Sequence, residues 1–173
     1  AEDSAVLDVI SGGRFELGLG TQIRQNVEGR YSARWLPPAA AMREYVGALR
    51  AIFRSFRSGA RLEYVGEHYR FTRLQPFFNP GPIDAPDVPI MLGAVGPKML
   101  ALAGEVADGL HAHPTNTSGR YLREVVLPRL GAGAAKRDAS VPAPLVCACT
   151  LVATGPDAAT VARERERLAG MLG

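Results

Sequence analysis

Two glycine-containing segments carry residue types that could bind an anion. In the first, PIMLGAVGPKML (residues 89–100), a hydrophobic strand runs into the loop Gly93-Ala94-Val95-Gly96 and then into a helix that begins at Pro97. The first backbone N–H groups of a helix point outward at the positive end of its dipole, and glycines let a phosphate approach closely. This loop predicts an anion cradle, to which Lys98 adds charge, although the pattern also fits a strand-to-helix turn that binds nothing.

The second segment, GRFELGLGTQIRQN (residues 13–26), is an alternating apolar run that ends in Gly18, Gly20 and Thr21. These three residues could also admit a phosphate or the polar tail of a cofactor. A dinucleotide-binding G-x-G-x-x-G fingerprint needs glycine where Ile23 stands, and the sequence contains no G-K-[ST] P-loop motif. A nicotinamide-binding fold is therefore disfavoured.

Two histidines, His111 and His113, lie at the end of a strand in DGLHAHPT (residues 108–115) and share one face of it. At the C-terminal mouth of a parallel barrel, such a face meets the ligand. Both histidines are therefore catalytic candidates, and polar lining of a loop mouth is the alternative. Neither has a carboxylate partner or a third ligand at metal-binding spacing, so we expect no metal site.

Four further side chains have a less direct interpretation. We expect His68 to face solvent from a hairpin, and Trp35 either to pack as a staple on the helix that follows it or to stack on a ligand ring. Cys147 and Cys149 would point the same way from one strand, which rarely permits a disulfide. We therefore expect buried thiols in a reducing cytosol.

The elements that must position these residues alternate between strands and helices. Apolar spacing of three and four predicts a helix after Pro37-Pro38, with the stripe Met42, Tyr45, Val46, Leu49, Ile52, Phe53 and Phe56. The other expected elements are a helix at 4–10 stopped by Ser11-Gly12-Gly13, a strand at 15–20, a hairpin of 62–65 and 68–71 around Gly66-Glu67, an extended loop at 76–89, a strand at 88–92, a helix at 97–107, a strand at 108–113, a helix at 118–130 bent or ended by Pro128, a long buried strand at 143–153 and a helix begun by residues 154–157. This alternation predicts an α/β fold with a parallel sheet, open or closed into a barrel.

Composition limits the domain count and the partners. The chain has 173 residues, 47% of them hydrophobic, and a net charge of +3, which suits one domain over residues 1–173 with one core. The arginines alternate with glutamates on helical stretches, so we expect solvated faces and no nucleic-acid partner. No apolar window reaches the length of a membrane span, and the first residues do not resemble a signal peptide. We expect a cytoplasmic protein.

Several motifs together resemble the luciferase-like flavin and deazaflavin oxidoreductase family, and most strongly its actinobacterial members that use coenzyme F420. The motifs are ISGGRFELGLGTQ, AMREYVGALRAIF, YVGEHYRF and PIMLGAVGPKMLALAGEVADGL, and the similarity runs from about residue 5 to about residue 165. The resemblance implies a (β/α)8 TIM barrel, present here as a partial barrel of about strands four to seven with a β-hairpin insertion. The chain is therefore expected to be a fragment whose exposed strand edges favour a homo-oligomer, a dimer, and it is expected to act on a small-molecule substrate.

The resemblance also implies where the cofactor binds. Its phosphate-bearing side is expected at Thr21, at the backbone of Gln22, at Asn26 and at the loop formed by Gly93, Ala94, Val95, Gly96 and Pro97. Family members that oxidise sugar phosphates carry T-G-E where this chain has Thr21-Gln22-Ile23, so their glutamate acid is missing and that substrate is put in doubt. The resemblance also implies a histidine and a tryptophan of the site on earlier strands, which would lie upstream of residue 1.

The function expected from the resemblance is transfer of a hydride between coenzyme F420 and an organic substrate. Two alternatives stay open: an FMN-dependent monooxygenase of the same fold, and a truncated, non-catalytic remnant that binds a phosphate ligand.

Overall fold

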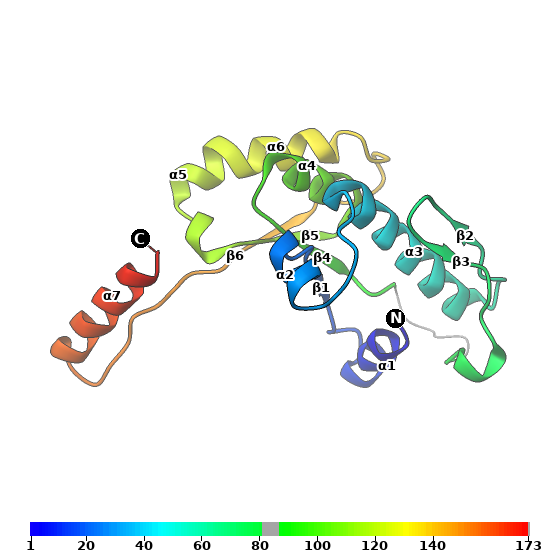
Figure 1. The fold of residues 1–173 in the computed structure, drawn as a ribbon, viewed down its shortest axis with the longest axis horizontal. Helices are drawn as coiled ribbons and strands as arrows, with labels where there is room; N and C mark the ends of the chain where they lie inside the picture. Colours follow the sequence, from blue (N-terminus) through cyan, green and yellow to red (C-terminus); the bar gives the residue numbers. More distant parts are fainter. Residues whose placement is uncertain (81–86, 173) are drawn as a thin grey trace.

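The computed structural model describes residues 1–80 and 87–172 (Figure 1). In its first half the elements are α1 (Glu2–Ser11), β1 (Leu17–Leu19), α2 (Arg24–Gly29), α3 (Pro38–Ser58), β2 (Tyr64–Val65), β3 (Arg70–Phe71) and a 3₁₀ turn (Pro76–Phe78). In its second half they are β4 (Ile90–Ala94), α4 (Pro97–Val106), β5 (Gly109–Ala112), a 3₁₀ turn (Pro114–Asn116), α5 (Gly119–Tyr121), a π-helical turn (Leu122–Val126), α6 (Leu127–Ala134), β6 (Leu145–Ala148) and α7 (Ala158–Leu172). Part of the expected loop at 76–89 lies outside the described residues.

The centre of the fold is a four-stranded parallel sheet with the order β1-β4-β5-β6. Each strand lies beside the next one along the chain, apart from the β2–β3 hairpin, and helices connect them (Figure 1). Parallel neighbours joined by helical crossovers are the repeating unit of α/β barrels. The predicted α/β class with a parallel sheet and an inserted hairpin is therefore confirmed.

The helix α3 supplies much of the core. Of the predicted stripe, Met42, Val46, Leu49, Phe53 and Phe56 are buried, while Tyr45 and Ile52 are half-buried against the same cluster. Their partners on the sheet include Ile90, Leu92 and Leu110, which are fully buried. The helix ends at Gly59, whose φ of 69° is the left-handed conformation that glycine adopts without steric cost.

Helices α4 and α6 pack with their backbones in close contact. A Cβ added to Gly133 would lie 1.8 Å from the carbonyl oxygen of Ala101, and one added to Gly104 would lie 2.0 Å from that of Leu130. Real Cβ atoms do not come this close to a backbone oxygen. Both glycines are therefore required for the position of α4, the helix that begins at the predicted anion cradle.

The hairpin is fastened to α3 by one carboxylate. Glu44 accepts hydrogen bonds from the backbone N–H groups of Glu67, His68 and Tyr69, at 3.1, 2.8 and 3.2 Å. These bonds, led by the one from His68, lower the pKa of Glu44. The predicted two-residue turn is wrong in detail: residues 66–69 form the turn, and a Cβ at Gly66 would lie 2.1 Å from a Glu44 oxygen.

A polar network joins the elements at the N-terminal edge of the sheet. The Asp108 carboxylate accepts a hydrogen bond from the Ile90 N–H at 2.8 Å. It also forms an ion pair with Arg50 of α3 at 3.0 Å. Arg137 donates to the carbonyls of Gly104 and Ala107, which lie at the C-terminal end of α4. The segment Ala107-Asp108-Gly109 therefore stabilises the scaffold at the edge of the sheet opposite the predicted cradle.

The last strand is the largest departure from the sequence prediction. The expected long buried strand at 143–153 is only Leu145–Ala148, because it is the edge of the described sheet and has a neighbour on one side alone. Leu145 is 63% exposed, Cys147 is half-buried and Cys149 is exposed, so the expectation of buried thiols is wrong; both cysteines are free. Figure 1 shows α7 standing away from the sheet beyond an extended segment.

Three other boundaries also differ from expectation. The short helix α2 was not predicted, and β4 ends two residues later than expected, so Gly93 and Ala94 belong to the strand. The helix predicted to bend or end at Pro128 continues to Ala134. Since Pro128 has no N–H to offer to the preceding turn, the π-helical turn Leu122–Val126 just before it absorbs the mismatch.

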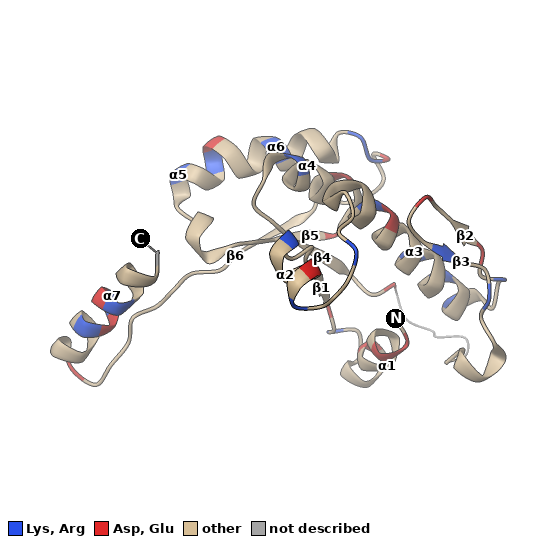
Figure 2. Ribbon diagram, in the orientation of Figure 1, with Lys and Arg blue, Asp and Glu red and all other residues tan. Residues whose placement is uncertain are grey.

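Charged side chains are interspersed over the surface. Figure 2 shows Lys and Arg alternating with Asp and Glu along α7 and around α5 and α6. Within the described residues, no helix has both the length and the apolar character needed to cross a bilayer.

Candidate functional site

The two glycine-containing segments end side by side at the same edge of the sheet. Strands β1 and β4 pair in parallel with Leu17, Gly18 and Leu19 opposite Ile90, Met91 and Leu92. A Cβ built on Gly93 meets the Leu19 carbonyl oxygen at 3.6 Å, which is ordinary contact. The chain after Leu19 and the chain after Ala94 therefore leave the sheet as neighbours, which is the arrangement the anion-binding hypothesis requires.

The loop before α4 has the geometry of an open anion cradle. Gly96 is the N-cap of α4 and Pro97 its first residue, and no side chain caps the N-terminal N–H groups. The N–H of Leu100 bonds to the Gly96 carbonyl, which leaves those of Lys98 and Met99 as the unpaired donors of the first turn. A Cβ at Gly96 would meet nothing within 4 Å, as would one at Gly20. These residues fit a phosphate, although the Ala94 side chain is buried in the core and only its backbone can face a ligand.

The segment after β1 is held in an unusual conformation. Gln22 has a φ of 58°, in the left-handed region that disfavours most side chains. Its Oε1 accepts hydrogen bonds from the Ile23 N–H at 3.1 Å and from Asn26 Nδ2 at 2.9 Å, which closes the turn into α2. Thr21 and Asn26 are half-buried. Strained backbone of this kind is common where a chain binds a ligand.

The two histidines lie in different environments. Gly93, His111 and Cys147 are opposite one another on β4, β5 and β6 and share one face of the sheet. The next row, Leu92, Leu110 and Val146, packs toward the helices, so the His111 row faces the other side. In contrast, His113 is exposed, and its Nδ1 bonds to Thr115 at the start of a 3₁₀ turn. His111 is therefore the histidine that faces the prospective barrel interior.

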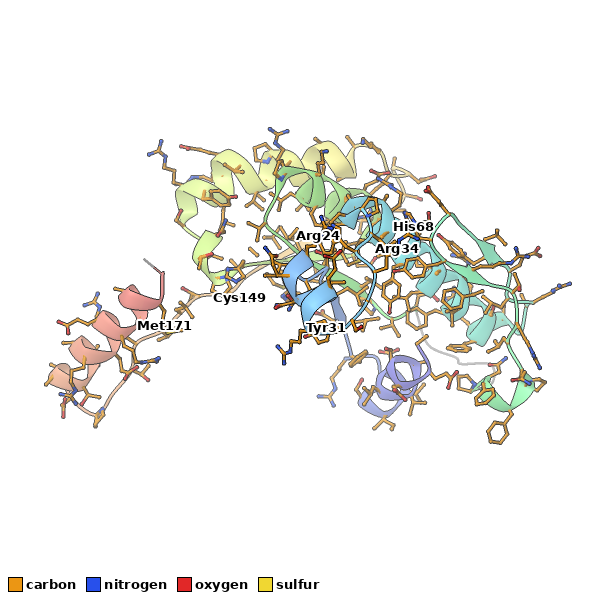
Figure 3. The ribbon with its side chains drawn as sticks, viewed as in Figure 1. Arg24, Tyr31, Arg34, His68, Cys149 and Met171 are labelled. Carbon is orange, nitrogen blue, oxygen red and sulfur yellow. The ribbon has the colours of Figure 1, made fainter. Side chains whose placement is uncertain are left out.

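A cavity of about 420 Å³ lies next to the β1 exit. Its walls come from Gly20 and Thr21, from the loop before α3, from α3 itself and from Tyr69 of the hairpin. Figure 3 labels Arg34, which belongs to that loop and lines the cavity together with Tyr69 of the hairpin. The segment 93–97 does not line this cavity, so the cavity and the cradle are adjacent but distinct.

One group of possible metal ligands occurs in the described part of the chain. Ligand atoms of Glu44, Glu67 and His68 lie within 4.8 Å of one another. Both oxygens of Glu44 are already occupied by the three backbone N–H groups of the hairpin turn. The cluster is therefore an anchor for the hairpin. The same contacts leave His68 half-buried, which corrects its assignment as solvent-facing.

The sequence did not predict that Glu44 binds the hairpin turn or that the rings of Tyr45 and Tyr69 are in contact. Tyr45 was assigned to the core stripe, and its ring lies 5.4 Å from that of Tyr69. The partners are more than twenty positions apart, so no local periodicity connects them. The sequence feature that could have indicated the hairpin contact is Gly66, next to the acidic Glu67, because a glycine permits a second chain segment to approach closely.

Comparison with known proteins places these features in a family. The sequence model of the family described as luciferase-like monooxygenase matches residues 1–172. An uncharacterised protein of Mycobacterium tuberculosis is 44% identical over 156 residues, which cover 90% of this chain and 46% of that protein. Another protein of that species, provisionally named a coenzyme F420-dependent oxidoreductase, is 42% identical over 112 residues, 60% of this chain and 31% of the relative.

The solved structures include the coenzyme F420-dependent tetrahydromethanopterin reductase of Methanopyrus kandleri. It matches with a TM-score of 0.63 and 24% identity, over 90% of this chain and 46% of that one. At 24% identity, this similarity shows a shared fold and nothing more. The chain spans about half the length of the relatives it matches.

Proposed function

The chain belongs to the luciferase-like monooxygenase family, and on this premise we propose that it is the cofactor-binding part of an oxidoreductase that transfers a hydride between coenzyme F420 and an organic substrate. The observation that carries the proposal is the pair of neighbouring strand exits, Thr21 after β1 and the uncapped helix start at Gly96 after β4. The provisional name of the mycobacterial relative supports F420 as the cofactor.

The residues of this chain would bind and orient the cofactor. The N–H groups of Lys98 and Met99 and the positive end of the α4 dipole face an anionic tail, and each such charge–dipole contact contributes about 0.3–1 kcal/mol. Thr21, the backbone of Gln22 and Asn26 lie on the other side of the same site. When bound, the deazaflavin ring supplies the hydride chemistry.

His111 is the side chain of this chain that we place nearest to the substrate. It shares a row with Gly93, one strand away from the cradle, and it is half-buried on the face that points away from the helices. An imidazole there can hold or deliver a proton beside a substrate oxygen. His113 is already engaged with Thr115 and serves the loop.

FMN is the second candidate cofactor. The family description names monooxygenases, and the cradle recognises a phosphate whichever ring is attached to it. Absorbance and fluorescence spectra of titrations with each cofactor distinguish the two, because the flavin and the deazaflavin absorb differently. Saturable binding of FMN without binding of F420 would replace the first proposal by the second.

We also propose that copies of the protein associate, as a homodimer, and that it works in the cytoplasm. The two edge strands, β1 and β6, have unpaired backbone groups in the described sheet, and Leu145 on β6 is 63% exposed. Free thiols at Cys147 and Cys149 suit a reducing compartment. Sedimentation over a range of concentrations tests the association, and a concentration-independent monomer would contradict it.

The experiment that tests the cofactor site compares three variants in a fluorescence titration with F420. Gly96→Asp puts a negative charge into the cradle, and repulsion between charges about 4 Å apart is strong enough to weaken binding more than tenfold. Aspartate is also a favourable N-cap, so this variant keeps or raises the stability of α4. Gly96→Asn has nearly the same shape without the charge and should weaken binding less.

The matched control is Gly131→Asp, at an open position in α6 far along the chain from the cradle. It should bind F420 like the parent protein. Equal affinities of the Gly96→Asp variant and the parent would overturn the proposed site.

A further inference from the structure

The cavity beside β1 has three aromatic side chains in its otherwise largely aliphatic walls. Trp35 comes from the loop before α3, Tyr45 from α3 and Tyr69 from the hairpin, and the two tyrosine rings are tilted at 53° with centroids 5.4 Å apart. The floor contains Leu19 and Met42, which belong to the core between the sheet and α3. Rings arranged in this way leave π-faces and edges for a planar guest.

One charged side chain, Arg34, lines the cavity. Within residues 1–80 and 87–172 it makes no hydrogen bond or ion pair, whereas Arg24 on nearby α2 is paired with Glu28 at 3.0 Å. An unpaired guanidinium at the rim can bind a carboxylate, sulfonate or phosphate through two parallel N–H bonds. Burial, followed by the nearby Tyr45 and Glu44, raises the pKa of Tyr69, so its phenol remains a donor at neutral pH.

The volume and the composition match those of small-molecule sites. At about 420 Å³ the cavity lies within the usual range of roughly 300–1,000 Å³ for ligand pockets, which combine apolar walls with a few polar groups. We propose that this cavity is a second ligand site, separate from the cofactor cradle, and that it binds a small aromatic anion, with the ring between Trp35 and the tyrosines and the anionic group on Arg34.

The position of the site gives its ligand access to the cofactor loop. Gly20 and Thr21 form one wall of the cavity and also follow the strand whose exit lies beside the cradle. A ligand in the cavity therefore touches the segment that leads into the strained Gln22 turn. The two sites share this segment, but binding of the aromatic anion does not require the cofactor.

The test uses Trp35, which is the only tryptophan of the chain and lies in the cavity wall. Acrylamide quenches tryptophan fluorescence by contact, so a ligand stacked on Trp35 protects it. The probe is benzenesulfonate, and its neutral counterpart is benzenesulfonamide. We expect benzenesulfonate to lower the quenching constant of Trp35 saturably, and benzenesulfonamide to bind about fivefold more weakly, as expected for loss of one partly exposed ion pair.

Two variants and their controls locate the binding. Arg34→Gln should reduce the affinity for benzenesulfonate to that for benzenesulfonamide, whereas Arg24→Gln removes a positive charge outside the cavity and should have no effect (Figure 3). Ala33→Phe fills the cavity and should abolish the protection, whereas Ala40→Phe, at an exposed position that does not line it, should preserve the protection.

Three outcomes would overturn the proposal. They are the absence of saturable protection, protection that survives Ala33→Phe, and equal affinity of the Arg34→Gln variant and the parent for benzenesulfonate. Gly96→Asp should leave benzenesulfonate binding unchanged while it weakens F420 binding, so failure of one site is distinguished from failure of the other.

Discussion

The contact between α4 and α6 gives a sharp prediction about the scaffold of the cradle. Gly133→Ala places a methyl group 1.8 Å from the Ala101 carbonyl oxygen and 3.0 Å from the Glu105 nitrogen. Both atoms are backbone, so no side chain can turn away. The helices must separate by more than about 1 Å to restore van der Waals contact, which loosens the contacts around Leu130 and Leu100.

The net cost follows from two opposing effects. Overpacking of a tight site costs about 1–3 kcal/mol, and replacing glycine by alanine within a helix returns about 0.5–1 kcal/mol. We therefore expect Gly133→Ala to lower the free energy of unfolding by about 1 kcal/mol, and by at most about 2.5 kcal/mol. For a chain of this size each 1 kcal/mol shifts Tm by about 2–4 °C.

The control lies two residues earlier in the same helix. A Cβ at Gly131 meets nothing within 4 Å, so Gly131→Ala gains the helix propensity without a clash and should raise the stability by about 0.5–1 kcal/mol. Urea unfolding followed by circular dichroism measures both variants, and F420 titration shows whether displacement of α4 disturbs the cradle. If the Gly133→Ala variant were as stable as the Gly131→Ala variant, the described backbone contact would be refuted.

Three further predictions concern single interactions. The pKa of Glu44 is lowered by the hairpin N–H groups, so its contribution to stability is present above the unfolded pKa of a glutamate and is lost as pH falls through the folded pKa; the protection factors of amides 67–69 against hydrogen exchange should fall in acid, and Glu44→Gln should remove this pH dependence. An acid response that persists in that variant would place its origin elsewhere. Gln22→Val should cost about 1–2 kcal/mol because a β-branched side chain is poorly suited to a φ of 58°, whereas Gln22→Asn should be milder; equal Tm values for the two would contradict the assigned backbone. Asp108→Ala leaves the Ile90 N–H without its acceptor and leaves Arg50 with only the Val106 carbonyl, and it should cost about 1–3 kcal/mol in urea unfolding, with F420 affinity unchanged because Asp108 lies at the opposite edge of the sheet; a selective loss of F420 affinity would show that the two edges are coupled.

The sequence alone determined the elements whose signals lie within a few turns of chain. The stop at Gly12, the stripe of α3 and the start of α4 at Gly96-Pro97 all follow from local caps and periodicity. Strand alternation then implied a parallel sheet, and parallel pairing brings the exits of β1 and β4 to one edge. The proposed cradle was therefore predictable, since each of its parts is encoded within about a dozen residues.

Tertiary structure decided everything that depends on a distant neighbour. The apolar run around Cys147 has the composition of a buried strand, but burial requires a second neighbour, and at the sheet edge only four residues pair. Glu44 meets the hairpin turn, and Trp35, Tyr45 and Tyr69 enclose a cavity, through contacts that no spacing in the sequence records. Local sequence fixes φ, ψ and amphipathic faces, whereas exposure and cavities arise from how those faces are brought together.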